Sequence, residues 1–225
     1  MTIINNHNII TLEKDDKNEF LLSHFNKHNV DIEISLDFEI LVNHLTSLSK
    51  EDYPFDFDPA FTPDTTHAVV SGSRYGAILL LKSGDNIVGT YAFKKALITN
   101  LIEQIPIYKE SAECVKPETL KAFWDGESLL DNQYYSSCQW IHPDFLGKRL
   151  GMALDHLKKY LIFDVLDGNI NWAMFTTGLE DYHTGKLTYQ DSAPLFTTPD
   201  KEYKVTWSTK EYWHSRFDYV KALYS

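Results

Sequence analysis

Residues 142–151 have the residue types and the spacing that suit phosphate binding. Their sequence, HPDFLGKRLG, sets Gly147 and Gly151 around the basic pair Lys148 and Arg149. They follow a β-rich run and open a stretch with helical periodicity, so we expect them to join a strand to a helix N-terminus. Unpaired backbone N–H groups and the positive end of the helix dipole meet at such a point, and both favour phosphate. We therefore expect this loop to cradle the pyrophosphate of a nucleotide-bearing cofactor.

The elements on either side of the loop are expected to hold it in place. Residues 134–141, YYSSCQWI, are rich in β-forming types and predict a strand. From about Gly147 to Phe163 the pattern is that of an amphipathic helix. Its apolar stripe is Leu150, Leu154, Leu157 and Leu161, and a second stripe carries Lys148, Arg149, Asp155 and Lys159.

The clearest strand pair comes before the loop. Residues 75–82 and 87–98 contain the apolar runs GAILLLK and IVGTYAFKKALI, and the turn SGDN between them has the Gly and Asp that hairpins favour. Nearer the N-terminus, periodicity predicts helices over residues 16–28 and 36–50, with a strand over residues 30–35 between them.

The rest of the chain is less regular. Residues 51–66 contain several prolines and are expected to form an ordered irregular loop, and residues 100–132 are ambiguous. Ser208 and Glu211 have the spacing of a capping box and predict a final helix. The remaining expected elements are short helices around residues 101–105 and 117–123 and strands over residues 171–177 and 203–207.

This order of elements predicts the α/β class, as an α+β sandwich with a mostly antiparallel central sheet flanked by helices. A length of 225 residues fits one domain. We therefore expect a single domain over residues 1–225. Residues 1–66 would be its helical or irregular N-terminal part and residues 208–225 its C-terminal helix.

The composition argues against several classes of protein. No apolar run approaches the about 20 residues of a membrane span, and the N-terminus lacks the features of a signal peptide. The two cysteines, Cys114 and Cys138, make neither a disulfide framework nor a zinc site. We expect a cytoplasmic protein without a membrane partner or a bound metal. The net charge of −11 disfavours a nucleic-acid partner. A negative net charge would attract a cationic amine substrate, but it can also be explained by solubility alone.

The loop and the hairpin together resemble a known family. A hairpin strand of the form I-V-G-x-Y-A, a strand ending in V-x-P, and an R/Q-x-x-G-x-G/A loop before a long helix are typical of the GNAT superfamily of acyl-CoA-dependent N-acyltransferases. Here the corresponding segments are residues 87–92 (IVGTYA), 141–143 (IHP) and 145–154 (FLGKRLGMAL). The resemblance covers residues 75–180. It implies a GNAT-like sheet, acetyl-CoA as acyl donor and an amine as acceptor.

Two residues depart from the family pattern. Leu146 stands where Arg or Gln is usual, which removes a polar loop contact, and Arg149 stands where Gly is usual, which adds a Cβ and a cation. Because the family's cradle consists mostly of backbone N–H groups, neither change excludes binding.

The resemblance also implies roles for named residues. Backbone groups of Gln139, Trp140 and Ile141 would pair with the pantetheine arm as an added strand would. N–H groups of the loop and helix start would hold the pyrophosphate, and Lys148 and Arg149 would add positive charge. The loop residues concerned are Gly147, Lys148, Arg149, Leu150, Gly151 and Met152.

Acyl transfer from a thioester needs a neutral amine, a polarised carbonyl and a proton for the departing thiolate. In the family a tyrosine after the next strand often protonates the sulfur; Tyr182 and Tyr189 lie in that region, and we favour Tyr182. Glu127 is our candidate base, acting through water. Cys138 has no histidine placed beside it by sequence and is expected to be a buried strand cysteine. The alternatives for the base are Asp131, Glu180, Asp181 and His183.

Other functions stay open. The altered loop also fits a non-catalytic GNAT-like module that binds CoA or serves as an interaction scaffold. A Rossmann-type binder is disfavoured because the G-x-G-x-x-G pattern is absent. For a transferase, residues 36–66, residues 100–132 and the C-terminal tail are expected to shape the site of a small-molecule or peptide amine, because many of their side chains are aromatic or acidic. The oligomeric state is left open, a dimer being one option.

Overall fold

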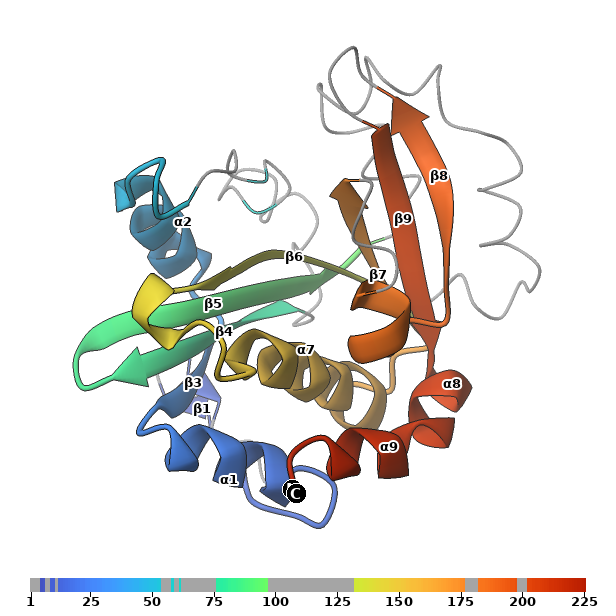
Figure 1. Cartoon of the computed structure of the whole chain (residues 1–225), viewed down its shortest axis with the longest axis horizontal. Coiled ribbons are helices and arrows are strands. Elements are labelled where there is room, and N and C mark those ends of the chain that lie inside the picture. The colour runs from blue at the N-terminus through green and yellow to red at the C-terminus, as the bar shows by residue number, and fades with distance from the viewer. Residues whose placement is uncertain are drawn as a thin grey trace. The chain divides into compact units, whose positions relative to one another are not determined.

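The computed structural model of the chain describes residues 12–53, 58, 61, 76–96, 132–176, 182–197 and 202–225, together with two short strands, β1 (Asn5–Asn6) and β2 (Ile9–Ile10). The chain divides into two compact units, whose elements are labelled in Figure 1. Unit 1 comprises residues 1–94, 137–160 and 218–225, and unit 2 comprises residues 95–136 and 161–217.

Unit 1 is built on a sheet with the strand order β1-β2-β3-β4-β5-β6, in which β1 to β5 pair antiparallel. Its longer strands are β3 (Asp31–Ser35), β4 (Gly76–Ser83) and β5 (Asn86–Lys95). The strand β6 spans Gln133–Ile141, and its second half, from Ser137 on, belongs to unit 1. The expected hairpin of β4 and β5 is confirmed, with Leu79 opposite Tyr91 and a turn at Gly84, whose φ is +60°. Residues 77–81 of β4 are buried on both faces of the sheet, which explains their unbroken apolar run.

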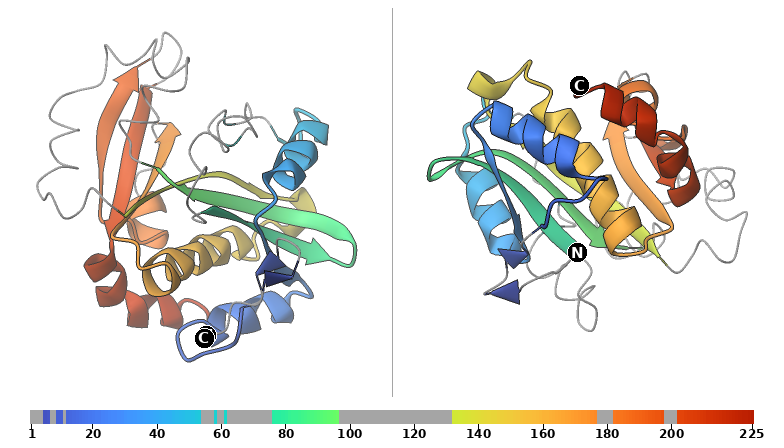
Figure 2. Two further views of the ribbon diagram at one scale, coloured as in Figure 1. Left: turned by 180° about the vertical axis from the view of Figure 1, so that it is seen from behind. Right: turned by 90° about the horizontal axis from the view of Figure 1, so that it is seen from below.

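Helices cover both faces of this sheet. α1 and α7 lie side by side on one side of β3, β4 and β5, and α2 lies on the other (Figures 1 and 2). Asp37 caps the N-terminus of α2, because its side chain accepts a hydrogen bond from the Glu39 amide. The helices expected over residues 16–28 and 36–50 are therefore confirmed. The helices of unit 1 whose full bounds the structure describes are α1 (Glu19–Lys27), α2 (Phe38–Ser47), the short 3-10 helix η4 (Pro143–Phe145), α7 (Leu150–Tyr160) and most of α9 (Phe217–Ala222).

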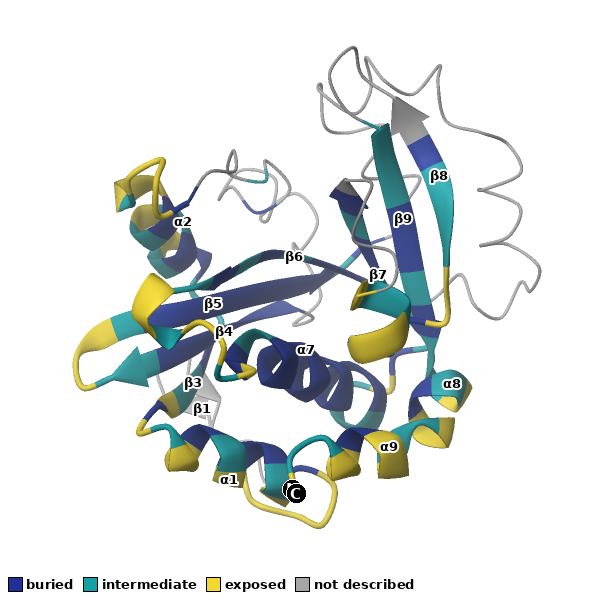
Figure 3. Ribbon diagram, in the orientation of Figure 1, coloured by how far each residue is buried: buried dark blue, intermediate teal, exposed yellow. Residues whose placement is uncertain are grey.

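α7 is buried along almost its whole length (Figure 3). Its expected apolar stripe is confirmed, because Leu150, Leu154 and Leu157 are all buried. The second stripe is not a solvent-facing surface, so the expected amphipathic pattern is wrong at Asp155 and Lys159. Both side chains are buried and pair with each other in the interior.

The start of α7 also differs from the expectation. The helix begins at Leu150 rather than near Gly147, because Gly147 and Arg149 both have a left-handed backbone, which an α-helix cannot include. Beyond Tyr160 the chain continues into a π-helical turn, η5 (Leu161–Val165).

Unit 2 contains the first half of β6 followed by β7 (Ile170–Thr176), β9 (Glu202–Thr209) and β8 (Asp191–Thr197) in that strand order. β6 and β7 run parallel, from Gln133 opposite Ile170 to Ser136 opposite Ala173. β7 pairs antiparallel with β9, and β9 with β8. Within its described residues, this unit has the short helices η5, η6 (Tyr182–Lys186) and α8 (Lys210–Ser215).

The strands expected over residues 134–141, 171–177 and 203–207 are confirmed, but β8 is a strand that the pattern did not predict. β8 is last in the strand order and contains Pro194, which lacks the N–H that a central strand needs and is tolerated at a sheet edge.

The expected capping box at Ser208 is wrong by one residue. β9 extends to Thr209, whose side chain accepts a hydrogen bond from the Tyr212 amide and starts α8. The helix expected over residues 208–225 is interrupted at Arg216, which separates α8 from α9. The short helices expected around residues 101–105 and 117–123 lie outside the described residues.

These elements confirm the α/β class, with a mostly antiparallel sheet flanked by helices. Within the described part of the chain, no helix has both the length and the apolar character needed to cross a bilayer.

Candidate functional site

The loop between β6 and α7 has an unusual backbone. It begins with η4, where His142 caps the helix by accepting a hydrogen bond from the Asp144 amide on Nδ1, at 3.2 Å. Gly147 then has a φ of +78° and Arg149 a φ of +58°, both in the left-handed region. Glycine reaches this region at little cost, whereas arginine does so only with strain. The chain therefore turns sharply twice just before α7 begins.

The backbone amides of this loop fall into two groups. The Asp144, Phe145 and Leu146 amides are used within η4, the last two donating to the carbonyls of His142 and Pro143. The next six amides have no acceptor among the residues that the structure describes, namely those of Gly147, Lys148, Arg149, Leu150, Gly151 and Met152. The first amide of α7 that finds an acceptor is that of Ala153, which donates to the Arg149 carbonyl at 2.9 Å. Free N–H groups at a helix start form a ready anion site.

The carbonyls of the same stretch are held by the protein. The Lys148 carbonyl lies 2.9 Å from Nε2 of His24 on α1, and the Gly151 carbonyl accepts a hydrogen bond of 2.6 Å from Nε2 of Gln139 on β6. A Cβ added to Gly151 would lie 3.2 Å from Gln139 Nε2 and 3.3 Å from Ile141 Cγ1. The start of α7 is thus packed tightly on β6, and Gly151 serves this close approach.

The two basic side chains of the loop contact protein groups. Lys148 Nζ lies 4.4 Å from the centre of the Phe145 ring, and Arg149 Nη1 donates to the Leu223 carbonyl at 2.8 Å. The candidate anion site therefore consists of backbone amides, and these contacts add no basic side chain to it.

The second half of β6 is irregular. Cys138 has a φ of +58°, which bends the strand, and its carbonyl accepts a hydrogen bond of 2.9 Å from Oγ1 of Thr90 on β5. A Cβ at Gly89 would lie only 2.8 Å from Ile141 Cδ1, so glycine lets β5 and β6 approach each other. The ladder of β6 with β7 ends at Ser136. Beyond this point no ladder with β7 occupies the outer edge of β6 in the described residues.

The expected pantetheine-binding residues lie on this bent part of β6. Trp140 is buried, and its indole N–H donates to the Asp52 carbonyl at 2.9 Å, so its side chain has a packing role. Gln139 and Ile141 are half-buried. Successive residues of a strand direct their backbone groups alternately to its two edges, so part of these groups faces the edge where the ladder with β7 has ended.

Cys138 and Lys94 are buried in unit 1 near Asp58. Burial raises the pKa of the Cys138 thiol well above its usual value, and the Asp58 charge raises it further, which makes this thiol a poor nucleophile. Burial lowers the pKa of Lys94 to about 8, against the attraction of Asp58 and Cys138. The Lys94 ammonium lies 5.4 Å from the centre of the Phe61 ring. The expectation that Cys138 is a buried strand cysteine is confirmed.

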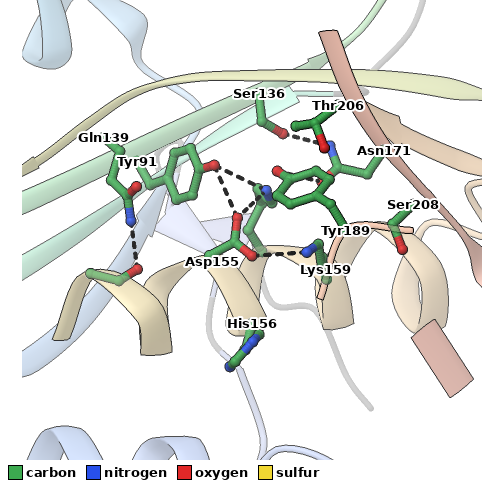
Figure 4. A network of polar contacts seen from close by, with 12 residues as sticks. Tyr91, Ser136, Gln139, Asp155, His156, Lys159, Asn171, Tyr189, Thr206 and Ser208 are labelled. Atoms are coloured by element: carbon green, nitrogen blue, oxygen red, sulfur yellow. Dashed lines mark hydrogen bonds and ion pairs between the residues drawn. The ribbon is translucent and has the colours of Figure 1, made fainter. Parts of the chain in front are cut away.

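A second polar cluster lies between β5 and α7 (Figure 4). Asp155 accepts hydrogen bonds from the Tyr91 hydroxyl at 3.0 Å and from Lys158 at 2.6 Å, and its other oxygen lies 3.0 Å from Lys159. Burial alone would raise the pKa of Asp155, but the two lysines outweigh it and the pKa lies below its usual value. Burial lowers the pKa of Lys159 to about 7, although Asp155 opposes this shift. This cluster connects β5, through Tyr91, to the helix that carries the loop.

In unit 2 the two candidate tyrosines differ in their surroundings. Tyr182 opens η6 and is 37% exposed, whereas Tyr189 is buried and its hydroxyl donates to Asn171 on β7 at 3.4 Å. Asn171 also donates to Ser136 Oγ at 2.6 Å (Figure 4). His183 stacks on Phe175, with ring centres 4.4 Å apart. Glu127, Asp131, Glu180 and Asp181 lie outside the described residues.

No cluster of three or more metal-ligating side chains occurs in the portion of the chain that the structure describes.

Comparison with known proteins identifies the fold. No protein-family model matches the sequence, and no curated protein matches it. A solved structure from Desulfovibrio desulfuricans, assigned to the GNAT family of acetyltransferases, has a TM-score of 0.48 at 11% identity over 80% of this chain and 99% of that chain. The dodecameric spermidine N-acetyltransferase from Vibrio cholerae has a TM-score of 0.51 at 9% identity, over 84% of this chain and 98% of that chain. A mutant of SpeG spermidine N-acetyltransferase from Vibrio cholerae reaches 0.50 at 9% identity over the same shares. The chain has the GNAT fold.

The two departures from the GNAT loop pattern now have a structural description. Arg149 keeps the left-handed backbone that a glycine at this position adopts freely. Leu146 is 63% exposed, so the polar residue usual there is replaced by an apolar side chain in contact with water.

Sequence reasoning missed the side-chain roles of three residues around the candidate site. His24, Thr90 and Gln139 each contact a backbone carbonyl of the loop, the bend of β6 or the start of α7. Gln139 was chosen only for its backbone. His24 lies 124 positions from Lys148 in the sequence, so periodicity and spacing had no signal for this contact.

Proposed function

We propose that this chain is an N-acyltransferase, which transfers an acetyl group from acetyl-CoA to a primary amine by direct attack. The observation that carries the proposal is the run of backbone amides from Gly147 to Met152 that finds no acceptor among the described residues. These amides lie at the start of a helix, where a diphosphate binds well. Their carbonyls are already bound elsewhere at Lys148, Arg149 and Gly151, so the loop needs little rearrangement to accept an anion.

The outer edge of β6 supports a role for Gln139, Trp140 and Ile141. Because the ladder with β7 ends at Ser136, their backbone groups are candidates for hydrogen bonds to the amides of a pantetheine arm. A backbone N–H near the bend at Cys138 would polarise the thioester carbonyl. Lys148 and Arg149 would add charge only after leaving Phe145 and Leu223.

Acyl transfer from a thioester requires only proton transfers from the side chains of the site. The amine nitrogen attacks the thioester carbon, the C–S bond breaks, the thiolate takes up a proton and the nitrogen loses one. The thioester is already activated, so positioning supplies much of the rate. Tyr182 is our candidate donor to the sulfur because its side chain is exposed, whereas the hydroxyl of Tyr189 is bound to Asn171. Glu127 remains our candidate base.

The acceptor is proposed to be a cationic amine. The net charge of −11 would attract such a substrate. Two similar structures are spermidine N-acetyltransferases, so a polyamine belongs in the first set of compounds to be tested.

The test mixes the purified chain with acetyl-CoA and a panel of polyamines, amino acids, aminoglycosides and lysine peptides, and measures free thiol. We expect thiol release above background with at least one cationic amine. Tyr182→Phe should lower turnover more than CoA affinity, whereas Tyr189→Phe should leave turnover nearly unchanged. Tight CoA binding without thiol release would identify a non-catalytic binding module instead. Absence of CoA binding would overturn both readings.

A further inference from the structure

His24 lies directly behind the diphosphate loop of unit 1. It belongs to α1, it is half-buried, and its ring packs against those of Tyr224 and His28, each with ring centres 4.8 Å apart. Its Nε2 lies 2.9 Å from the Lys148 carbonyl oxygen. A carbonyl oxygen can only accept, so Nε2 must carry a hydrogen and donate it.

This hydrogen bond fixes the direction of a loop amide. A trans peptide is planar, and the N–H of one residue points opposite to the C=O of the residue before it. The Lys148 carbonyl is turned toward His24, so the Arg149 N–H points away from α1. The next peptide is fixed in the same way, because the Arg149 carbonyl accepts from the Ala153 amide. The Arg149 and Leu150 amides are both among those without an acceptor in the described residues.

The Lys148–Arg149 peptide is the weak point of this arrangement. A rotation of that peptide by about half a turn would bring φ of Arg149 from +58° to a negative value and so relieve its strain. The same rotation would replace the outward N–H by the carbonyl oxygen of Lys148, which repels phosphate. A glycine at position 149 would lack this strain. The replacement of glycine by arginine therefore creates a need for a group that holds the peptide in place.

We propose that His24 is a positioning residue of the diphosphate site, which holds the Lys148–Arg149 peptide with its N–H toward the bound anion. It compensates for the arginine at a position where the GNAT loop pattern has glycine. Tyr224 supports it by packing against the ring, while the Tyr224 hydroxyl bonds Nδ1 of His156 on α7 at 2.7 Å. The inference rests on the proposed function, because it assumes that the loop binds the diphosphate of CoA.

The test compares His24→Phe, which keeps a ring without a donor, with His24→Gln, whose amide nitrogen can still reach the carbonyl. Isothermal titration measures binding of CoA and of pantetheine, which lacks the diphosphate. We expect H24F to bind CoA about tenfold more weakly, the loss of about one hydrogen bond to a charged group. H24Q should stay within about threefold of the wild type, and pantetheine binding should not change in either variant.

A double variant separates positioning from general packing. If the peptide rotates to relieve strain at Arg149, then Arg149→Gly should remove the drive to rotate. We therefore expect H24F combined with R149G to bind CoA within about threefold of R149G alone. A purely structural role of the His24 ring would leave the double variant as weak as H24F.

The possible results distinguish a failure of the proposed function from a failure of the role of His24. A wild type that binds neither CoA nor inorganic pyrophosphate would overturn the proposed function and this inference together. A wild type that binds CoA, with H24F binding equally well, would overturn the inference alone. Equal weakening in H24F and H24Q would also overturn it, because the donor would then not be the cause. If thermal unfolding shows that H24F does not fold, His24→Met takes its place in every comparison.

Discussion

Gly147 and Arg149 both have a left-handed backbone, with φ of +78° and +58°, although only the first is a glycine. The two turns lie immediately before the first residue of α7. They let the chain leave η4 and enter the helix while six successive amides remain without an acceptor in the described residues. Position 149 therefore has a conformation that glycine adopts freely, although its residue is an arginine.

The strain at Arg149 predicts the relative stability of two variants. Arg149→Gly and Arg149→Ala both lose the hydrogen bond to the Leu223 carbonyl, so this loss cancels between them. Only alanine keeps a Cβ at positive φ, so we expect R149G to be more stable than R149A by about 1 kcal/mol. Urea unfolding of the two variants measures this difference. An R149A variant as stable as R149G would show that the left-handed conformation carries no cost here.

The surroundings of Gly147 leave room for a side chain, but its backbone conformation disfavours one. A Cβ at Gly147 would meet no atom within 4 Å, yet its φ of +78° is strained for any residue with a branched Cβ. We therefore expect Gly147→Val to weaken CoA binding by about tenfold or more and to lower the melting temperature by only a few degrees. Gly147→Asn is the matched control, because asparagine adopts left-handed conformations more readily. CoA affinity equal to that of the wild type in a folded G147V would remove Gly147 from the site.

The buried cluster on α7 should depend on its carboxylate. Asp155 is 0% exposed and contacts Lys158 and Lys159, so Asp155→Asn would remove the negative charge that both buried lysines contact. We expect D155N to lower the free energy of unfolding by about 3–5 kcal/mol. Lys159→Met keeps the Asp155–Lys158 pair and should cost clearly less. Urea unfolding decides, and a D155N variant within about 1 kcal/mol of the wild type would contradict the ion-pair account.

Lys94 should make stability depend on pH in the alkaline range. Its pKa is about 8 in the folded chain, against 10.5 as the usual value, because the side chain is buried. Between these two values the unfolded chain holds a proton that the folded chain lacks, so the free energy of unfolding rises with pH. Below pH 8 the full penalty remains, and Lys94→Met should then stabilise the chain by about 1–3 kcal/mol. Unfolding curves from pH 7 to 10.5 measure this. Equal pH slopes in K94M and wild type would contradict it.

Much of the fold could be predicted from local patterns. Apolar periodicity identified α1, α2 and the buried stripe of α7, and the SGDN turn identified the β4–β5 hairpin. The pattern misjudged the polar side of α7, because Asp155 and Lys159 satisfy each other inside the protein. A charged residue is expected to be exposed to solvent unless an oppositely charged side chain pairs with it in the interior. Whether such a pair forms depends on the tertiary structure.

The remaining misses have physical causes as well. β8 contains Pro194, which argues against a central strand and is tolerated at the edge. The bend of β6 lies at Cys138 and a left-handed turn lies at Arg149. Neither residue is a glycine, so the sequence gives no local signal for a positive φ at these positions. The sequence GKRLG of residues 147–151 was enough to locate the loop. The contact of His24 with the Lys148 carbonyl, however, comes from a helix far away in the sequence. Such contacts follow from tertiary packing and leave no local signal.

The amides from Gly147 to Met152 are proposed to bind a diphosphate. The most direct measurement is a two-dimensional ¹H–¹⁵N nuclear magnetic resonance titration of the chain with CoA, with pantetheine as the control ligand. We predict that CoA shifts the amide resonances of residues 147–152 and that pantetheine leaves them in place. Saturable CoA binding without any shift at these amides would contradict the account.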